Sequence, residues 1–331
     1  MKSILIIGGA GYIGSHVVLA FLENGFDVTV LDNLRSGRQI NLFEDAGFLH
    51  ADLQDRVALG KVFQKPYDGV VHLAALKAAG ESMIVPEQYA YQNIAGTINL
   101  LEAMANSKTR ILIFSSSAAV YGMPEYLPLD EAHALQPANF YGFTKLEIER
   151  LLDWFFRLKG IHFASLRYFN AAGYDKEGRI RGLEKKPANL IPVVMETAMG
   201  WREQVEVFGN DYPTSDGTGM RDYIHVSDLA DAHVKAFSHV QHDRESITVN
   251  LGTGQRFSVM EVIRKAEQIS GKTIPFTITE RRPGDPAELY ASAEKAMKLL
   301  KWQPVYSDLE TIVDTTWKIY KEKDKSDAPY R

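Results

Sequence analysis

The chain has 331 residues, of which 45% are hydrophobic and 24% are charged, and its formal net charge is −5. This balance is typical of a globular protein, and the small negative charge argues against nucleic acid or an anionic membrane as the main partner. The chain has no cysteine, which excludes disulfides, thiolate catalysis and cysteine-bound metal. No window approaches the ~20 apolar residues that a membrane span needs, and we expect a cytoplasmic protein.

The first half of the chain alternates short β-branched runs with amphipathic stretches of helical length. Most of the runs are apolar on both faces, as parallel strands covered by helices on each side must be. This pattern predicts a doubly wound parallel α/β sheet of the Rossmann type. The predicted strands are 3–7, 27–31, 48–50, 69–73, 111–115 and 162–167, and the predicted helices are 12–23, 56–63, 87–105 and 141–159.

After Gly173 the alternation becomes looser, and the charged, glycine-containing segment 175–187 predicts a loop or linker. Further helices are predicted at 189–200, 227–240, 259–270 and 309–323, with shorter strands between them. We therefore predict a Rossmann domain at residues 1–173 and a smaller C-terminal α/β substrate domain at 174–331. Some elements are expected to cross back, and a cleft is expected between the two parts.

A glycine-rich turn, GGAGYIG at residues 8–14, follows the first predicted strand and opens the first helix. Glycine lets the backbone approach a pyrophosphate, which the N–H groups at the helix N-terminus can then bind. Asp32 ends the second predicted strand, where a ribose-binding carboxylate is expected. The predicted dinucleotide-binding residues of this part are Gly8, Gly11, Tyr12, Ile13, Gly14 and Asp32.

Asp32 also bears on the choice between NAD and NADP. A carboxylate accepts hydrogen bonds from the two ribose hydroxyls of NAD and repels the 2′-phosphate of NADP. Arg35 and Arg38 lie nearby in the sequence and favour the opposite choice. We give Asp32 more weight because the end of a strand fixes its place, and we predict NAD.

Tyr141 and Lys145 lie four residues apart on a predicted helix and therefore share a face. Ser115 and Ser117 lie at the carboxyl end of a predicted parallel strand, where ligands bind in open α/β sheets. A lysine ammonium and a positive nicotinamide ring both favour the phenolate form of a tyrosine and lower its pKa. The pair alone is more often structural than catalytic, but the glycine turn and the strand-end serine together favour catalysis.

The glycine turn, the serine and the Tyr-x-x-x-Lys pair together resemble the extended short-chain dehydrogenase/reductase superfamily, whose members catalyse several reactions. Three further stretches resemble the UDP-glucose 4-epimerase family within it: HLAALKAAGES at 72–82, RYFN at 167–170 and, most specifically, FGNDYPTSDGTGMRDYIHV at 208–226. The resemblance extends over nearly the whole chain. It implies an NAD-dependent isomerase that interconverts UDP-galactose and UDP-glucose through a 4-keto sugar.

The resemblance also implies residue roles. Tyr141 is implied as the base that removes the 4′-hydroxyl proton, Ser117 as the residue that positions or relays this proton, and Lys145 as the residue that tunes Tyr141 and binds the nicotinamide ribose. The further cofactor-binding residues that it implies are Asn33, Ser36, Asp52, Leu53, Leu73, Ala74, Lys77, Asn93, Ser115, Tyr141, Lys145 and Tyr168. The substrate-binding residues that it implies are Lys77, Ser117, Tyr141, Phe169, Asn170, Asn189, Leu190, Val207, Phe208, Arg221, Arg282 and Asp285. No cluster of His, Asp and Glu has metal-ligand spacing, and no metal site is predicted.

Leu289 lies at a position where, in this family, side-chain bulk is associated with whether an N-acetylated sugar fits. Leucine is neither small nor aromatic. We predict a preference for the non-acetylated sugars.

Other functions built on the same fold remain open. A sugar-nucleotide 4,6-dehydratase shares the fold but typically has an Asp-Glu pair after the active-site serine or threonine, where this chain has Ala118-Ala119. A non-catalytic NAD-sensing regulator would have no need of Tyr141 and Lys145. Helices 87–105 and 141–159 match the helices through which related enzymes form a homodimer, although their apolar residues could equally serve the internal core.

Overall fold

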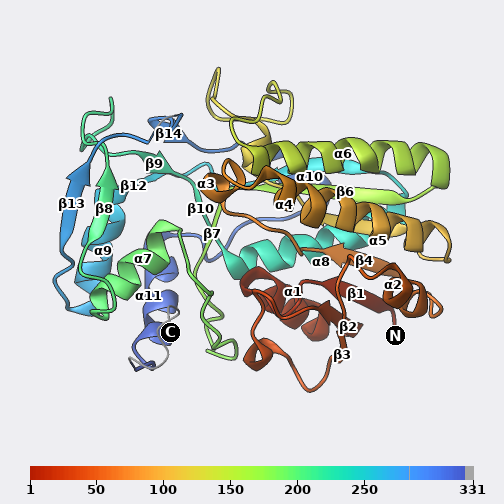
Figure 1. Ribbon diagram of the computed structural model, residues 1–331. Coiled ribbons are helices and arrows are strands. Elements are labelled where there is room, and N and C mark those ends of the chain that lie inside the picture. Colours follow the sequence, from red (N-terminus) through yellow and green to blue (C-terminus); the bar gives the residue numbers. More distant parts are fainter. Residues whose placement is uncertain (283, 325–331) are drawn as a thin grey trace.

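The computed structural model describes residues 1–282 and 284–324, so residues 325–331 of the predicted C-terminal domain lie outside the described part. Its centre is a seven-stranded parallel sheet with the strand order β11-β6-β5-β4-β1-β2-β3 (Figure 1). The predicted doubly wound α/β fold is confirmed. The strands are β1 (Ser3–Ile7), β2 (Asp27–Asp32), β3 (Gly47–His50), β4 (Gly69–His72), β5 (Ile111–Ser115), β6 (His162–Tyr168) and β11 (Ile247–Leu251).

The two faces of the sheet are covered by different helices (Figure 1). In β1, Ile4 and Ile6 pack into a core shared with α1 (Tyr12–Glu23) and α8 (Val226–Asp243). Leu5 and Ile7 point the other way, into a core shared with α2 (Arg56–Val62), α5 (Gly96–Ala105) and α6 (Phe140–Lys159). Side chains alternate between the faces of a strand, so an uninterrupted apolar run needs a helical layer on each side.

The predicted helix 87–105 is interrupted in the structure. It consists of α4 (Pro86–Tyr89), a π-helical segment (Ala90–Ala95) and α5. Asn93 lies in the π-helical segment, and its side-chain amide bonds both the N–H and the carbonyl of Leu76. Such π-segments are rare and are found mainly at functional sites.

The C-terminal part has its own core, built from α7 (Leu190–Ala198), α9 (Val259–Ser270), α11 (Leu309–Tyr320) and β8 (Val205–Phe208). Three elements that follow residue 173, α8, β11 and α10 (Glu294–Leu300), instead belong to the central sheet and its helical layer. Within the described residues no helix is both long and apolar enough to cross a membrane. The remaining elements are α3 (Ala79–Ser82), β7 (Asn170–Ala172), β9 (Met220–Arg221), β10 (Tyr223–His225), β12 (Phe257–Ser258), β13 (Phe276–Thr279) and β14 (Glu288–Leu289).

Candidate active site

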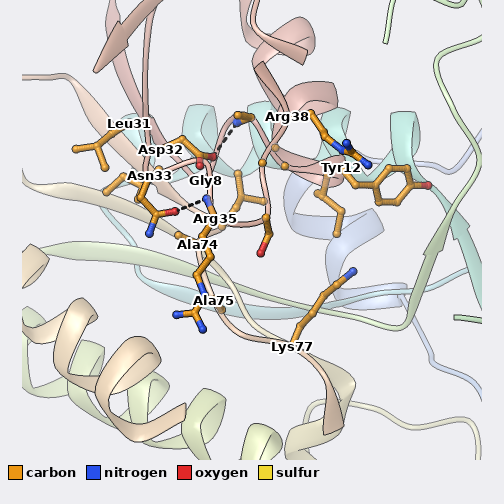
Figure 2. Close-up of a pocket in the computed structure, with 18 of the residues that line it drawn as sticks. Gly8, Tyr12, Leu31, Asp32, Asn33, Arg35, Arg38, Ala74, Ala75 and Lys77 are labelled. Atoms are coloured by element: carbon orange, nitrogen blue, oxygen red, sulfur yellow. Dashed lines mark hydrogen bonds between the residues drawn. The ribbon is translucent and has the colours of Figure 1, made fainter. Parts of the chain in front are cut away.

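A pocket lies at the carboxyl ends of β1, β2 and β4, and the turn between β1 and α1 forms one wall (Figure 2). Gly8 has a φ of +84°, and a Cβ there would come within 2.8 Å of the backbone nitrogen of Ala74. A Cβ on Gly14 would lie 2.0 Å from the carbonyl oxygen of Gly8. The glycines therefore let the start of α1 pack tightly on the turn. Gly11 caps α1 without any side-chain hydrogen bond, and this leaves the N-terminal N–H groups of the helix for an anion.

The carboxylate of Asp32 is held in place at the edge of this pocket. Its Oδ2 accepts a hydrogen bond from the N–H of Ala10 (3.0 Å), and its Oδ1 accepts one from the N–H of Leu34 (2.8 Å). Beside it, the Asn33 amide donates to Oδ2 of Asp52 (2.7 Å). An acidic edge of this kind suits the two ribose hydroxyls of NAD and is unfavourable for a 2′-phosphate. Together with the phosphate-binding turn, these residues fit NAD.

The segment 175–187, predicted as a loop or linker, has no helix or strand, but it closes one side of the cofactor pocket. Leu183 and Glu184 line the pocket, and Glu184 forms an ion pair with Lys77. Figure 2 shows Lys77 at the end of the Ala74–Lys77 segment, beneath the turn that carries Gly8. No local sequence pattern indicates this contact, because it joins residues more than a hundred positions apart.

The same segment is hydrogen-bonded to the loop that follows β2. Arg38 donates from Nε to the carbonyl of Leu183 (3.1 Å), and the N–H of Gly182 donates to Oδ1 of Asn41 (2.9 Å). Lys185 donates to the carbonyls of Leu34 (3.1 Å) and Arg35 (3.2 Å). Arg38, which in the sequence favoured NADP, therefore has a role in holding this segment in place.

The pocket brings together most of the predicted cofactor residues. It also contains residues that the sequence patterns did not assign to the site, among them Gln92, Leu183 and Glu184. Asn93 does not line the pocket: its amide holds Leu76 and donates to the hydroxyl of Thr144 (3.1 Å), so its direct contact with the cofactor stays a prediction. The predicted residues that line the pocket are Gly8, Gly11, Tyr12, Ile13, Gly14, Asp32, Asn33, Ser36, Asp52, Leu53, Leu73, Ala74, Lys77 and Tyr168.

Tyr141 and Lys145 lie on successive turns at the start of α6, facing the end of β5. Lys145 donates from Nζ to the carbonyl of Ser115 (2.7 Å), and Nζ lies 5.8 Å from the centre of the Tyr141 ring. The Ser117 side chain lies close enough to Tyr141 to lower the pKa of its phenol. The Ser115 hydroxyl contacts the hydroxyl of Tyr168, which lines the cofactor pocket. The predicted tyrosine, lysine and serine thus form one cluster beside that pocket.

Burial strongly affects both ionisable groups. It raises the pKa of the Tyr141 phenol to about 12, although the nearby Ser117 side chain acts in the opposite direction. It also lowers the pKa of Lys145 to about 7, against the attraction of the Glu149 carboxylate. The expected net lowering of the Tyr141 pKa is therefore not produced by the protein groups alone, because desolvation of the phenolate outweighs them. A bound nicotinamide ring would add positive charge that favours the phenolate.

Several predicted substrate residues gather in the C-terminal part. The guanidinium of Arg282 lies over the ring of Phe208, 3.7 Å from its centre, and Arg221 forms an ion pair with Asp285. Pro283, next to Arg282, lies outside the described residues. The side chain of Val207 is buried in the C-terminal core, so its backbone is the part left for a ligand.

The other predicted substrate residues lie at the ends of short elements. Asn189 is the N-cap of α7 and makes no capping hydrogen bond with its side chain, and Leu190 is the first residue of that helix. Asn170 donates from its side chain to the carbonyl of Asp222 (2.9 Å), the residue after Arg221. Phe169 packs on a small core against which Leu289 also packs. In the described part of the chain, no group of three or more His, Cys, Asp or Glu residues could hold a metal ion.

The known proteins that this chain resembles belong to an NAD-dependent family, in agreement with the NAD-binding geometry of the pocket. The NAD dependent epimerase/dehydratase family matches residues 4–252. The UDP-glucose 4-epimerase of Halalkalibacterium halodurans is 46% identical over 97% of this chain and 96% of that protein, and the enzyme of Bacillus subtilis is 44% identical over 96% of each.

The solved structures that resemble this chain belong to the same family as these sequence relatives. The UDP-glucose 4-epimerase of Brucella ovis in complex with NAD superposes with a TM-score of 0.94 at 39% identity, covering 97% of this chain and 98% of that one. The UDP-Glc/GlcNAc 4-epimerase of Campylobacter jejuni superposes with a TM-score of 0.86 at 38% identity, covering 98% of this chain and all of that one. The chain therefore belongs to the NAD dependent epimerase/dehydratase family and, within it, to the UDP-glucose 4-epimerases.

Proposed function

We propose that this protein interconverts UDP-galactose and UDP-glucose, and that it serves galactose metabolism in the cytoplasm. The observation that carries the proposal is the cluster of Tyr141, Lys145 and Ser117 directly beside a pocket suited to NAD. A base next to a bound redox cofactor can remove the proton of a sugar hydroxyl while its carbon is oxidised. Membership of the UDP-glucose 4-epimerases supports the same reaction.

In the proposed reaction Tyr141, as the phenolate, takes the proton from the 4′-hydroxyl of the sugar and later returns it. The Ser117 hydroxyl, which lies near Tyr141, orients that oxygen or relays the proton. Lys145 supplies positive charge beside the phenolate and is anchored by the carbonyl of Ser115. NAD, when bound, supplies the oxidation at C4 and the re-reduction on the other face.

For the nucleotide end of the substrate we propose Arg221 and Arg282 as ligands of the diphosphate. A guanidinium can bind phosphate oxygens in a bidentate manner. Both groups now have partners that such binding would replace: Asp285 for Arg221 and the ring of Phe208 for Arg282. With Arg282 moved onto phosphate, the Phe208 ring is free to lie against the uracil. We also propose residues 1–173 and 174–331 as the cofactor and substrate domains, with α8, β11 and α10 crossing back to the cofactor domain.

The dehydratase alternative is disfavoured by the residues after Ser117. Ala118 and Ala119 stand where a dehydratase needs an acid–base pair, and neither side chain can exchange a proton. The regulator alternative is disfavoured because a protein that only binds NAD has no need of the buried Lys145. Burying Lys145 is costly, as its lowered pKa shows, and groups with strongly shifted pKa values cluster at functional sites.

We further propose a homodimer formed through α5 and α6, which lie beside one another on one face of the molecule (Figure 1). Trp154 and Leu158 are one turn apart on α6 and are 58% and 69% exposed, and Ile98 on α5 is 40% exposed. Large apolar side chains left in water on neighbouring helices are typical of a surface that another chain covers. A second copy of this chain is the occupant that we propose.

The proposed function is tested by incubating the purified protein with UDP-galactose, without added NAD, and measuring UDP-glucose by chromatography. We expect UDP-glucose to form until the two sugars reach equilibrium, with no build-up of NADH. A 4-keto-6-deoxy product would instead establish the dehydratase. If no product forms even when NAD is supplied, the regulator alternative is favoured.

A further inference from the structure

Each of the three serines at the end of β5 makes a different contact in the active-site region. The carbonyl of Ser115 holds the Lys145 ammonium, and the side chain of Ser117 lies near Tyr141 and acts to lower its pKa. The hydroxyl of Ser116, which lies between them, points to a third residue of α6: it donates to Oε1 of Glu149 (2.5 Å). Tyr141, Lys145 and Glu149 are spaced by four residues each and so lie along one face of α6.

Glu149 is also the partner of a buried arginine. Arg167, near the end of β6, donates from Nε to Oε1 of Glu149 (2.9 Å) and from Nη2 to Oε2 (2.5 Å), with the two side chains only 6% and 8% exposed. The third nitrogen of Arg167, Nη1, donates to the hydroxyl of Tyr121 (3.0 Å). The next residue along β6, Tyr168, contacts the hydroxyl of Ser115. The Glu149 carboxylate of α6 is thus hydrogen-bonded both at the end of β5 and near the end of β6, beside the catalytic cluster.

The charges around Lys145 can be counted element by element. On α6 its titratable neighbours are Tyr141, whose ring centre lies 5.8 Å from Nζ, and Glu149. On β6, Arg167 joins the cluster through its ion pair with Glu149. On β4 the nearby titratable group is His72, which burial keeps neutral by lowering its pKa to about 3. The cluster therefore holds two cations, Lys145 and Arg167, and one anion.

Glu149 is the group that offsets this positive charge. Its attraction raises the pKa of Lys145 and so opposes the effect of burial. Without the carboxylate, Arg167 would stay charged because a guanidinium does not deprotonate, and Lys145 would be the group that loses its proton. The positive charge would then lie on Arg167, whose nitrogens bond Glu149 and Tyr121 and not Tyr141.

We propose that Glu149 is a positioning residue for the reaction: with Ser116 and Arg167 it fixes the serines of β5 on α6, and it keeps Lys145 in the ammonium form beside Tyr141. The inference rests on the proposed function for the identity of the reaction. The geometry on which it stands does not depend on that choice.

The test uses Glu149→Gln, which removes the negative charge while nearly keeping the volume of the side chain. In the NAD-bound enzyme we expect kcat for UDP-galactose at pH 7 to fall about tenfold or more while KM stays within about twofold, because a change of one unit in a pKa is a tenfold change in the ratio of the two forms. Without the charge of Glu149, Lys145 loses its proton at lower pH. In a plot of kcat against pH, the change in kcat that accompanies this deprotonation should therefore move to lower pH.

A second readout does not depend on turnover. The ultraviolet absorbance of tyrosinate in the NAD-bound protein, taken as the difference from the Tyr141→Phe variant, reports ionisation of Tyr141. We expect this signal to appear at higher pH in Glu149→Gln than in the wild type, because the nearest cation is neutralised. If the wild type does not epimerise at all, the proposed function fails, and this titration still decides the role of Glu149.

Three further variants separate positioning from stability. Arg167→Gln leaves Lys145 as the only cation beside the Glu149 carboxylate, so the tyrosinate signal should shift to lower pH. This variant replaces Glu149→Gln in the test if Glu149→Gln does not fold. Glu149→Asp keeps the negative charge, so its kcat should be higher than that of Glu149→Gln and lower than that of the wild type. Asp228→Asn removes a buried carboxylate that has no bond to the Glu149 cluster and instead bonds the N–H groups of Val305 and Tyr306. It should lower the melting temperature without moving either profile. Unchanged pH profiles and an unchanged tyrosinate titration in Glu149→Gln would overturn the proposal.

Discussion

At the scale of single residues, the proposed chemistry depends on the hydroxyl of Tyr141. Its pKa is raised to about 12 by burial, so the phenolate forms only where positive charge is placed beside it. The sequence predicted the tyrosine, the lysine and the serine, because their spacing and strand-end position are local features. It did not predict the effect of burial, because desolvation depends on how the whole chain packs around the phenol.

Tyr141→Phe removes this hydroxyl and keeps the ring. We expect the epimerisation rate to fall by at least about 100-fold, the usual contribution of a general acid–base group. NAD and UDP binding, measured by calorimetry, should change little because the ring still fills its place. Turnover near the wild-type rate would contradict the role of Tyr141 as the base.

Leu289 is the residue at which sugar specificity can be tested. It lies in β14 opposite Arg221 and packs on the small core that also contacts Phe169. We predict that kcat/KM for UDP-galactose exceeds that for UDP-N-acetylgalactosamine by about tenfold, the size of discrimination that bulk in an apolar pocket can supply. Leu289→Ala should reduce this ratio and Leu289→Tyr should increase it. Equal kcat/KM for both sugars in the wild type would refute the prediction.

At the scale of elements, the strands and helices of the central sheet were predicted within a few residues, because apolar periodicity and glycine turns mark them locally. Three features could not be predicted in this way. The π-helical segment around Asn93, the contact of segment 175–187 with the pocket, and the place of β11 in the central sheet all depend on partners distant in sequence. The π-helical segment and the segment 175–187 both form part of the wall of the cofactor pocket.

The segment 175–187 allows a test at this scale. A Cβ on Gly182 would lie 2.3 Å from Oδ1 of Asn41, and Asn41 cannot easily move because its amide also donates to the carbonyl of Ala10. We expect Gly182→Ala to displace the segment and to speed the release of bound NAD about tenfold, equivalent to about 1.4 kcal/mol. Exchange with labelled NAD measures this rate.

Gly60→Ala is the matched control for this prediction. Gly60 lies in α2, and a Cβ there meets nothing within 4 Å. Its release rate should equal that of the wild type. If Gly182→Ala also released NAD at the wild-type rate, the segment would have no part in retaining the cofactor.

At the scale of the whole molecule, the exposed apolar residues of α5 and α6 predict the state of assembly. Trp154→Glu places a charge in the proposed interface, where it would be buried without a partner, so we expect light scattering to show a monomer. Val305→Glu is the control: Val305 is also exposed, at 70%, but its N–H bonds Asp228 of α8, which covers the face of the central sheet opposite α6. A wild-type protein that is monomeric at micromolar concentration would refute the homodimer.

The central claim is that C4 of the sugar is oxidised and reduced again within one closed site. The most direct measurement follows UDP-galactose that carries deuterium at C4, with the product analysed by NMR and mass spectrometry. We predict that the UDP-glucose formed retains the deuterium at C4, because the same two electrons and the same hydrogen leave and return without contact with water. Loss of the deuterium to solvent would mean that C4 is deprotonated rather than oxidised, and it would contradict the proposed mechanism.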